Sequence, residues 1–199
     1  MGKVDPIPKA GTIAALRADA ADCKACPLWK PATQTVFGEG PDDAEIVMVG
    51  EQPGDKEDMA GKPFVGPAGA LLDRALDEAD VDRAKVYVTN AVKHFKFTQR
   101  GKRRLHQRPN GGEIKACRFW LSGELNALRP RLVVALGATA LRSLAGKALP
   151  IGRHRGRILD LGGTKVLPTV HPSYLLRIPD EDARARAYRH FVADLKLVR

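Results

Sequence analysis

The sequence predicts an α/β fold: one domain with a central, mostly parallel sheet that is flanked by helices. Short, continuous apolar runs of strand length alternate with segments of helical periodicity along the chain. The chain has 199 residues, 44% of them hydrophobic, which is enough for one well-buried core and too little for two comfortable domains. No internal repeat or low-complexity segment interrupts the alternation. We therefore expect residues 1–199 to form a single domain.

The expected elements follow from the apolar runs and the helix boundaries. Parallel strands buried on both faces have nearly continuous apolar sequences, so three such runs are assigned as strands: 45–50, 85–90 and 131–137. Segments with helical spacing are assigned as helices: 12–21, 70–79, 113–128, 138–144 and 180–198. Residues 157–161 and 165–170 are expected to pair as a hairpin, and residues 93–112 are expected to form a long basic loop.

Three strand ends carry polar residues, and the carboxyl ends of parallel strands are where such folds bind ligands. These ends are Gly50-Glu51-Gln52, Asn90 and His171. Each has an ordinary alternative, because a glycine-rich loop is often only a tight connection, Asn90 can cap a turn and His171 can be structural. Phe64, among glycines and prolines, is either a base-stacking platform or a plug for its own loop. The amide of Asn90 offers an acceptor and two donors, so it can read the edge of a ring that presents both a donor and an acceptor.

Basic residues dominate the charge and cluster in one segment. Lys and Arg total 33 against 23 Asp and Glu, for a net charge of +10. Seven basic and no acidic residues lie between Lys93 and Gly112, which favours a polyanionic partner over a merely basic composition. No apolar stretch approaches the roughly 18 residues of a membrane span, and Met1 to Asp5 contain no signal core. We therefore expect a cytoplasmic protein without a membrane partner.

Three cysteines, an odd number, argue against a disulfide framework. Cys23 and Cys26 form a Cys-x-x-Cys pair and Cys117 lies far away in the sequence, a pattern that favours metal or redox chemistry in the cytoplasm. A metal site usually needs a fourth ligand. The residues alone do not separate a zinc ion from an iron–sulfur cluster, and a small, buried, apolar role for Cys117 is the alternative to both.

Taken together, the strand-end motifs resemble those of a known enzyme family. Three motifs fall in the order and spacing found in uracil-DNA glycosylases: Gly50-Glu51-x-Pro53-Gly54, Thr89-Asn90 and His171-Pro172-Ser173. Over residues 12–198 the chain resembles the iron–sulfur branch, family 4. Two features depart from ordinary members, namely Gln52 in the first motif and the additional basic segment 101–106. Both resemble the subgroup called uracil-DNA glycosylase X, whose members bond covalently to DNA.

The resemblance implies a uracil-DNA glycosylase-like fold and a single-turnover, suicide enzyme. It would excise uracil, preferably from single-stranded DNA, and then bond to C1′ of the abasic deoxyribose. His106 would be the nucleophile, Glu51 would orient it and offset its growing charge, and Gln52 would position the ring or sugar. His171 would donate a hydrogen bond to O2 of the leaving uracil.

The resemblance also implies the binding residues, the cofactor and the partners. The uracil-containing nucleotide would be bound by Asp55, Phe64 and Asn90, and DNA phosphates by Lys102, Arg103 and Arg104. His94 stands where family 4 has a cysteine. A structural 4Fe–4S cluster, with zinc as the alternative, would therefore tie an N-terminal segment at about 12–30 to the core through Cys23, Cys26, His94 and Cys117. We expect a bacterial monomer that associates with the nucleoid through DNA.

Other functions remain compatible with the residues. A family 4 glycosylase with normal turnover would release its product, and a non-catalytic, metal-stabilised DNA-binding module would need only the charge and the cysteines. His106 would then be a passive contact in a solvated basic turn. A redox protein built on Cys23 and Cys26 is disfavoured, because the pair precedes the sheet and Cys117 is unpaired. Release of uracil and denaturing electrophoresis with uracil-containing DNA separate these functions.

Overall fold

The computed structural model describes residues 11–199; residues 1–10, with the Met1–Asp5 segment considered above, lie outside the described residues. The strands are β1 (Ile46–Gly50), β2 (Val86–Asn90), β3 (Phe97–Arg100), β4 (Arg103–His106), β5 (Leu132–Leu136), β6 (Leu159–Leu161) and β7 (Thr164–Thr169). The helices are α1 (Ile13–Ala20), α2 (Asp55–Ala60), α3 (Pro67–Glu78), α4 (Gly111–Leu128), α5 (Ala138–Ala145), α6 (Ile151–His154), α7 (Pro172–Leu176) and α8 (Glu181–Leu195). Short 3-10 turns lie at Pro27–Trp29, Arg83–Lys85 and Lys196–Val198.

The central sheet has the strand order β2-β1-β5-β7-β6. All neighbours are parallel except the edge strand β6, which pairs antiparallel with β7. The predicted α/β fold with a mostly parallel sheet is thus confirmed, and so is the predicted hairpin around Gly162-Gly163. In the pairing of β1 with β2, Gly50 lies directly beside Asn90. This register brings the first two polar strand ends together.

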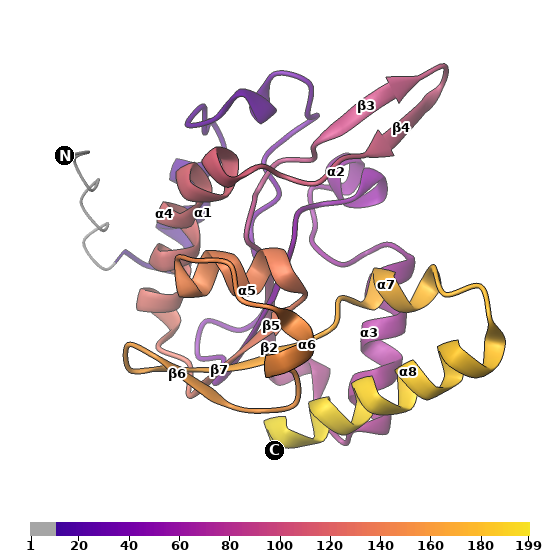
Figure 1. The fold of residues 1–199 in the computed structure, drawn as a ribbon. Helices are drawn as coiled ribbons and strands as arrows, with labels where there is room; N and C mark the ends of the chain where they lie inside the picture. Colours follow the sequence, from indigo (N-terminus) through magenta and orange to yellow (C-terminus); the bar gives the residue numbers. More distant parts are fainter. Residues whose placement is uncertain (1–10) are drawn as a thin grey trace.

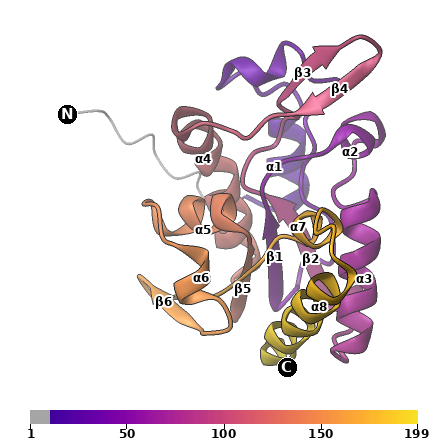
Figure 2. The same ribbon diagram turned by 45° about the vertical axis from the view of Figure 1, so that its right-hand side comes forward.

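Helices cover both faces of the sheet, with α3 and α8 on one side and α4 and α5 on the other (Figures 1 and 2). Alternate side chains of a strand point to opposite faces. In β1, Val47 and Val49 pack with apolar side chains of α1, α4 and α5, whereas Met48 packs with those of α3 and α8. Each fully buried side chain of this kind contributes roughly 1.5–3 kcal/mol. Two apolar layers therefore hold the strand ends rigidly in place.

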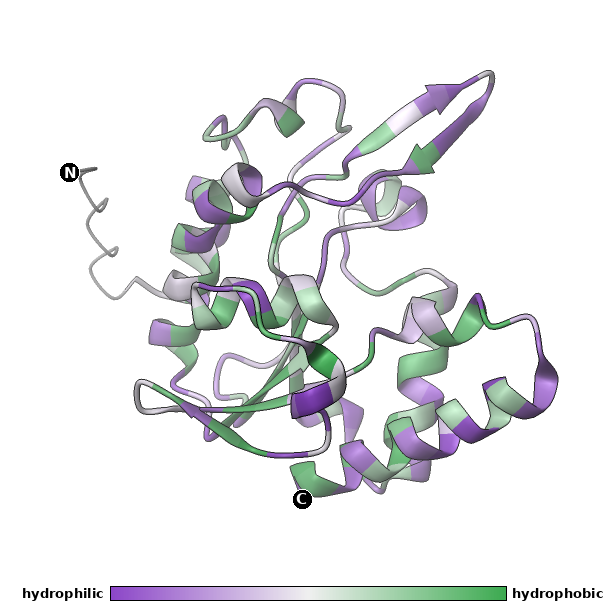
Figure 3. Cartoon of the chain, in the orientation of Figure 1, coloured by the Kyte–Doolittle hydropathy of each residue, from purple (hydrophilic) through white to green (hydrophobic). Residues whose placement is uncertain are grey.

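The prediction that residues 93–112 form a long loop is wrong. Within them, β3 and β4 form an antiparallel hairpin that projects from the body of the protein (Figures 1 and 2). Most of its residues are polar and exposed, and Figure 3 colours it largely as hydrophilic, so it lacks the apolar alternation that marks a strand. Gly101 closes the turn at a positive φ of 58°, a conformation that glycine adopts without strain.

Three short helices also escaped prediction: α2, α6 and α7. Each has at most six residues, which is too short to show helical periodicity. Two of them follow strand ends, since α2 begins after the first motif and α7 begins directly after His171. Among residues 11–199, no helix has the length and apolar character needed to cross a membrane.

Candidate active site

One cleft of about 1290 Å³ opens at the carboxyl ends of the parallel strands. It is lined by side chains from the loops after β1, β2, β5 and β7, together with the end of β4. All seven residues predicted to act on or bind the nucleotide line it: Glu51, Gln52, Asp55, Phe64, Asn90, His106 and His171. Residues far apart in the sequence therefore meet here, as the strand-end rule predicts.

Asn90 and Phe64 form one wall of this cleft above Gly50. A Cβ built at Gly50 would collide with Oδ1 of Asn90 and with the ring of Phe64, so only glycine lets both side chains approach the strand. Phe64 has a positive φ of 57°, which is strained for an aromatic residue. Its ring lies 6.2 Å from that of His171 between centroids, at an interplanar angle of 28°. A flat ligand ring could therefore stack on Phe64 while its edge bonds the side-chain amide of Asn90.

His171 is a neutral hydrogen-bond donor. Burial lowers the pKa of His171 to about 4, and the positive charge of Arg177 acts in the same direction. Its Nδ1 accepts a hydrogen bond from the backbone N–H of Ser173 at 3.1 Å and lies 2.8 Å from the hydroxyl of Ser173. Because a neutral imidazole carries one proton, Nδ1 as acceptor places that proton on Nε2. Nε2–H is then free to donate to a ligand in the cleft.

His106 stands at the end of β4, with its side chain half exposed to the cleft. Its ring packs 6.1 Å from that of the buried Phe95, between centroids, and its Nε2 lies 3.4 Å from Oε1 of Glu51. Burial lowers the pKa of His106 more than the charge of Glu51 raises it, and Arg177 and Arg108 lower it further. The imidazole is therefore neutral near pH 7 and keeps one nucleophilic nitrogen lone pair.

Glu51 is held from two sides. Its Oε2 accepts a hydrogen bond from the hydroxyl of Thr139 and lies 3.7 Å from Nε of Arg108, while Oε1 faces His106. Roles for Thr139 and Arg108 were not predicted from the sequence. Thr139 follows the carboxyl end of β5, so the strand-end rule could have found it. A carboxylate fixed in this way can orient an imidazole and offset a positive charge on it.

Gln52 fastens the base of the hairpin. Its side-chain nitrogen donates to the backbone oxygens of Lys96 and Gln107, each at 3.1 Å, and its Oε1 accepts from the backbone N–H of Lys96 at 3.2 Å. These bonds join the entrance and the exit of the hairpin to the loop after β1. Gln52 is 7% exposed and holds the hairpin that carries His106, and its predicted role in positioning the ring or sugar stays a prediction.

Arg104 turns inward, although it was predicted to hold DNA phosphate with Lys102 and Arg103. Its guanidinium pairs at 2.5 Å with both Asp55 and the fully buried Asp58, and it lies over the rings of Phe95 and Phe97. Side chains two positions apart on a strand share a face, so this anchor also turns His106 toward the body. Lys102 and Arg103 remain exposed at the tip, open to a polyanion.

Comparison with known proteins decides the family. Residues 37–196 match the model of the uracil DNA glycosylase superfamily. The chain belongs to this superfamily. The type-4 uracil-DNA glycosylase of Thermotoga maritima is 44% identical over 164 residues, which cover 81% of this chain and 82% of that protein. The type-4 enzyme of Saccharolobus solfataricus is 37% identical over 79% of this chain and 74% of its own length. That of Pyrobaculum aerophilum is 39% identical over 79% of this chain and 81% of its own length. The predicted family is confirmed, and the covalent subgroup stays a prediction.

The three cysteines of this superfamily member gather near the amino end of α4. Trp120 Nε1 donates to Sγ of Cys23 at 3.1 Å, and the backbone N–H of Lys93 donates to Sγ of Cys117 at 3.2 Å. Burial raises the pKa of Cys26 and raises that of Cys117 to about 12, with smaller contributions from the other cysteines. Bonds from N–H groups to sulfur are typical around thiolate ligands, and a metal would ionise such thiols.

The fourth predicted ligand, His94, is buried and follows Lys93, whose backbone N–H bonds Cys117. Its Nε2 lies 3.0 Å from the hydroxyl of Thr35, and burial lowers its pKa, so the ring is neutral as a metal ligand requires. Within residues 11–199, no three His, Cys, Asp or Glu side chains are grouped closely enough to hold a single metal ion. Three thiols and an imidazole are donors that iron–sulfur clusters and zinc sites both use, so the cluster and its zinc alternative both stay predictions.

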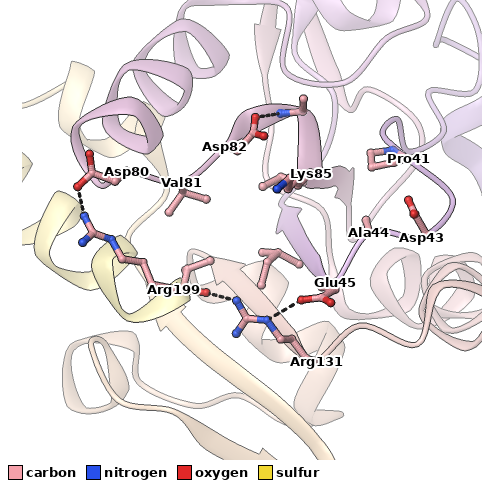
Figure 4. Close-up of a pocket in the computed structure, with 14 residues that line it drawn as sticks. Pro41, Asp43, Ala44, Glu45, Asp80, Val81, Asp82, Lys85, Arg131 and Arg199 are labelled. Carbon is pink, nitrogen blue, oxygen red and sulfur yellow. Dashed lines mark hydrogen bonds and ion pairs between the residues drawn. The ribbon is translucent and has the colours of Figure 1, made fainter.

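A second pocket, of about 620 Å³, lies at the opposite ends of β1 and β2 in this glycosylase-family fold (Figure 4). Four of its charged side chains form two ion pairs, and a fifth bonds the backbone. Arg131 Nε lies 3.1 Å from Glu45, Arg199 pairs with Asp80, and Asp82 accepts from the backbone of Ala84 at 3.0 Å. None of the predicted site residues lines it.

Proposed function

We propose that the chain excises uracil from DNA and then bonds through His106 to C1′ of the abasic deoxyribose, as a glycosylase of the X subgroup. One observation carries the proposal: a neutral His106, 3.4 Å from Glu51, lines the same cleft as Asn90 and His171. Family membership and the type-4 relatives support uracil in DNA as the substrate. The hairpin that carries His106 supports the covalent step.

Excision begins with a uracil that has left the base stack. Unstacking costs a few kcal/mol in a duplex and less in a single strand, which favours single-stranded substrates. Phe64 stacks on the extruded ring, and Asn90 bonds its N3–H and O4 edge, where cytosine presents the opposite donor and acceptor pattern. As the bond from N1 to C1′ breaks, its electron pair goes to uracil, and Nε2–H of His171 stabilises the negative charge on O2.

Capture follows at the sugar. A lone pair of the His106 imidazole forms the bond to C1′ of the oxocarbenium-like sugar, at an effective concentration that water does not reach. The imidazole keeps its own proton, so the adduct is an imidazolium, whose charge Glu51 offsets; the uracil anion takes a proton from solvent. Gln52 and Arg104 hold the hairpin during this step. The occupied C1′ leaves no path for water, so the protein acts once.

DNA is held by exposed cations around the cleft. Lys102 and Arg103 at the hairpin tip, with Arg108 and Arg177 at the cleft, supply phosphate contacts whose strength falls with salt. Asp55, paired with Arg104, lines the cleft and would contact the substrate through its free oxygen. We expect the protein to act as a monomer, because every proposed group belongs to one chain.

The proposed cofactor is a structural 4Fe–4S cluster held by Cys23, Cys26, His94 and Cys117. The N–H donors on the sulfurs of Cys23 and Cys117 support this donor set. When bound, such a cluster ties the segment after α1 to α4 and to the residues after β2. Excision needs no electron transfer, so no step of the reaction runs through it.

The test is His106→Ser, compared with His154→Ser, a histidine outside the cleft lining. Wild-type protein and His154→Ser should release uracil and carry a uracil-containing oligonucleotide through denaturing electrophoresis, with the matching gain in intact mass. His106→Ser should release uracil and leave free abasic DNA. A denaturation-resistant complex with His106→Ser would show that another residue forms the bond. If the wild-type protein releases uracil but forms no adduct, the protein is a type-4 enzyme with normal turnover instead.

A further inference from the structure

A fully buried ion pair lies directly beneath the uracil-reading strand end. Lys93 Nζ contacts Glu124 Oε2 at 2.6 Å, and both side chains have no exposed surface. Lys93 follows β2 by three residues, and Glu124 lies about one turn before the end of α4. Neither side chain lines the cleft, and the proposed reaction uses neither.

The ammonium of Lys93 grips the end of β2 itself. Besides Glu124, it donates to the backbone oxygen of Asn90 at 2.9 Å and to the hydroxyl of Thr89 at 2.5 Å. It thereby fixes both the main chain of Asn90 and the side chain of the residue before it. The register of β1 with β2 fixes the opposite edge of Asn90 through Gly50.

Glu124 gathers polar groups from three further positions. Its carboxylate accepts from the hydroxyls of Tyr87 and Thr89, at 3.0 and 2.9 Å, and from the backbone N–H of Gly38 at 3.1 Å. With Lys93 it therefore joins α4, β2 and the loop before β1 in one network. Every polar atom of the pair is satisfied, as a buried charged group requires.

Stability alone does not explain such a pair. Well-packed apolar side chains of the same size often serve a buried position as well as an ion pair does or better, because desolvation offsets the Coulomb attraction. Charge-assisted hydrogen bonds have a preferred geometry, whereas apolar packing tolerates small shifts. The hydrogen bond from Lys93 Nζ to the backbone carbonyl of Asn90 therefore restricts the position of the Asn90 side-chain amide.

We propose that the Lys93–Glu124 pair is a positioning device that holds Asn90 in register with a flipped uracil. The inference rests on the proposed excision of uracil. It assigns Lys93 and Glu124 a role through Asn90, without contact to substrate. The backbone N–H of Lys93 also donates to Sγ of Cys117, so the same residue joins the cysteine site to the base-reading amide.

A double-mutant cycle between Lys93 and Asn90 tests this role. Lys93→Met should slow excision in a single turnover by about 100-fold, the scale of a misplacement by about 1 Å. Asn90→Ala should add little to that loss, because the amide is already misplaced. The matched control is Leu76→Ala, a core truncation in α3, chosen to lower the melting temperature similarly. In the Leu76→Ala, Asn90→Ala double variant, the fold-losses in excision rate of the two single variants should multiply. Losses of Lys93→Met and Asn90→Ala that multiply would overturn the proposal.

Lys93→Met combined with Glu124→Gln separates positioning from stability. This double variant leaves no unpaired buried charge, so its melting temperature should recover relative to Lys93→Met. Excision should stay slow, because the Asn90 carbonyl still lacks its donor; recovery of excision together with stability would contradict the positioning role. If wild-type protein excises no uracil, the proposed function fails by itself. A crystal structure of Lys93→Met then decides the inference: Asn90 displaced from Phe64 supports it, and Asn90 unmoved refutes it.

Discussion

The two ends of the same parallel strands carry opposite kinds of pocket. At the amino ends, charges are matched inside the protein: Arg131 pairs with Glu45, and Arg199 with Asp80 (Figure 4). At the carboxyl ends, the cleft holds two neutral imidazoles, His106 and His171, together with Asn90. Across residues 11–199, no hydrogen bond engages the side-chain amide of Asn90 or the Nε2 of His171. The amino-end pocket thus contains two internal ion pairs, whereas the cleft keeps the amide of Asn90 and the Nε2 of His171 for a ligand.

The difference shows what marks a reactive pocket. Size alone does not, since both pockets could admit a small molecule. A group that must bond a ligand has to forgo an internal partner, and the fold supplies that condition where strands end and loops begin. His171 illustrates it: the partner on Nδ1 fixes the ring, so that Nε2–H stays available. At the amino ends, by contrast, Arg131 and Arg199 are bonded to carboxylates of the protein itself.

Among these variants, His171→Ala should cause the largest loss of excision rate, because it removes the free Nε2–H donor from the cleft. Loss of one such donor typically slows a reaction by about 10²–10³-fold. We expect single-turnover excision to fall by that factor and the adduct to appear equally slowly, because capture follows excision. The control is His154→Ala, outside the cleft lining. A His171→Ala variant within threefold of wild type would exclude the donor role.

Arg104→Gln should separate the two parts of the cleft, because it loosens the hairpin that carries His106 and leaves the Asn90 and His171 side chains in place. Without its bonds to Asp55 and Asp58, β4 no longer holds His106 over the sugar. Excision should continue, while the share of product captured as adduct falls by about tenfold as water competes. Quantifying adduct and free abasic DNA in the same reaction measures this partition.

Arg103→Gln is the matched control for the hairpin, one residue away and exposed. It should weaken DNA binding and reduce the salt dependence of affinity by about one phosphate contact. Its partition between adduct and free product should equal that of wild type. Equal partition in the Arg104→Gln variant as well would mean that the anchor does not position His106.

The sheet and its strand ends could be predicted because their physical causes are local. β1, β2 and β5 are buried on both faces, so their sequences are mostly apolar runs, and β1 and β2 end beside polar residues. Parallel strands align their carboxyl ends, so Asn90 and the Gly50 loop were expected to meet. The register of β1 with β2 confirms that meeting.

The hairpin and its anchors could not be predicted, because their causes lie in tertiary contacts. β3 and β4 are short and polar, and their pairing is stabilised by Arg104 reaching Asp58 and by Gln52 reaching Lys96. The sequence marks Arg104 only as one basic residue among many. Nothing in a basic run indicates which side chain turns inward, since that depends on a buried carboxylate 46 residues away.

Arg131→Gln, at the amino-end pocket, should have the smallest effect. The pair with Glu45 is largely exposed, so its loss should lower the free energy of unfolding by about 1 kcal/mol or less. The hydrogen bond from Arg131 to the backbone oxygen of Val198 adds a similar contribution. Excision and adduct formation at saturating DNA should match wild type, because none of these groups lies near the cleft. A tenfold loss of excision with an unchanged melting temperature would show that the amino-end pocket acts on the site, and the separation of the two ends would be wrong.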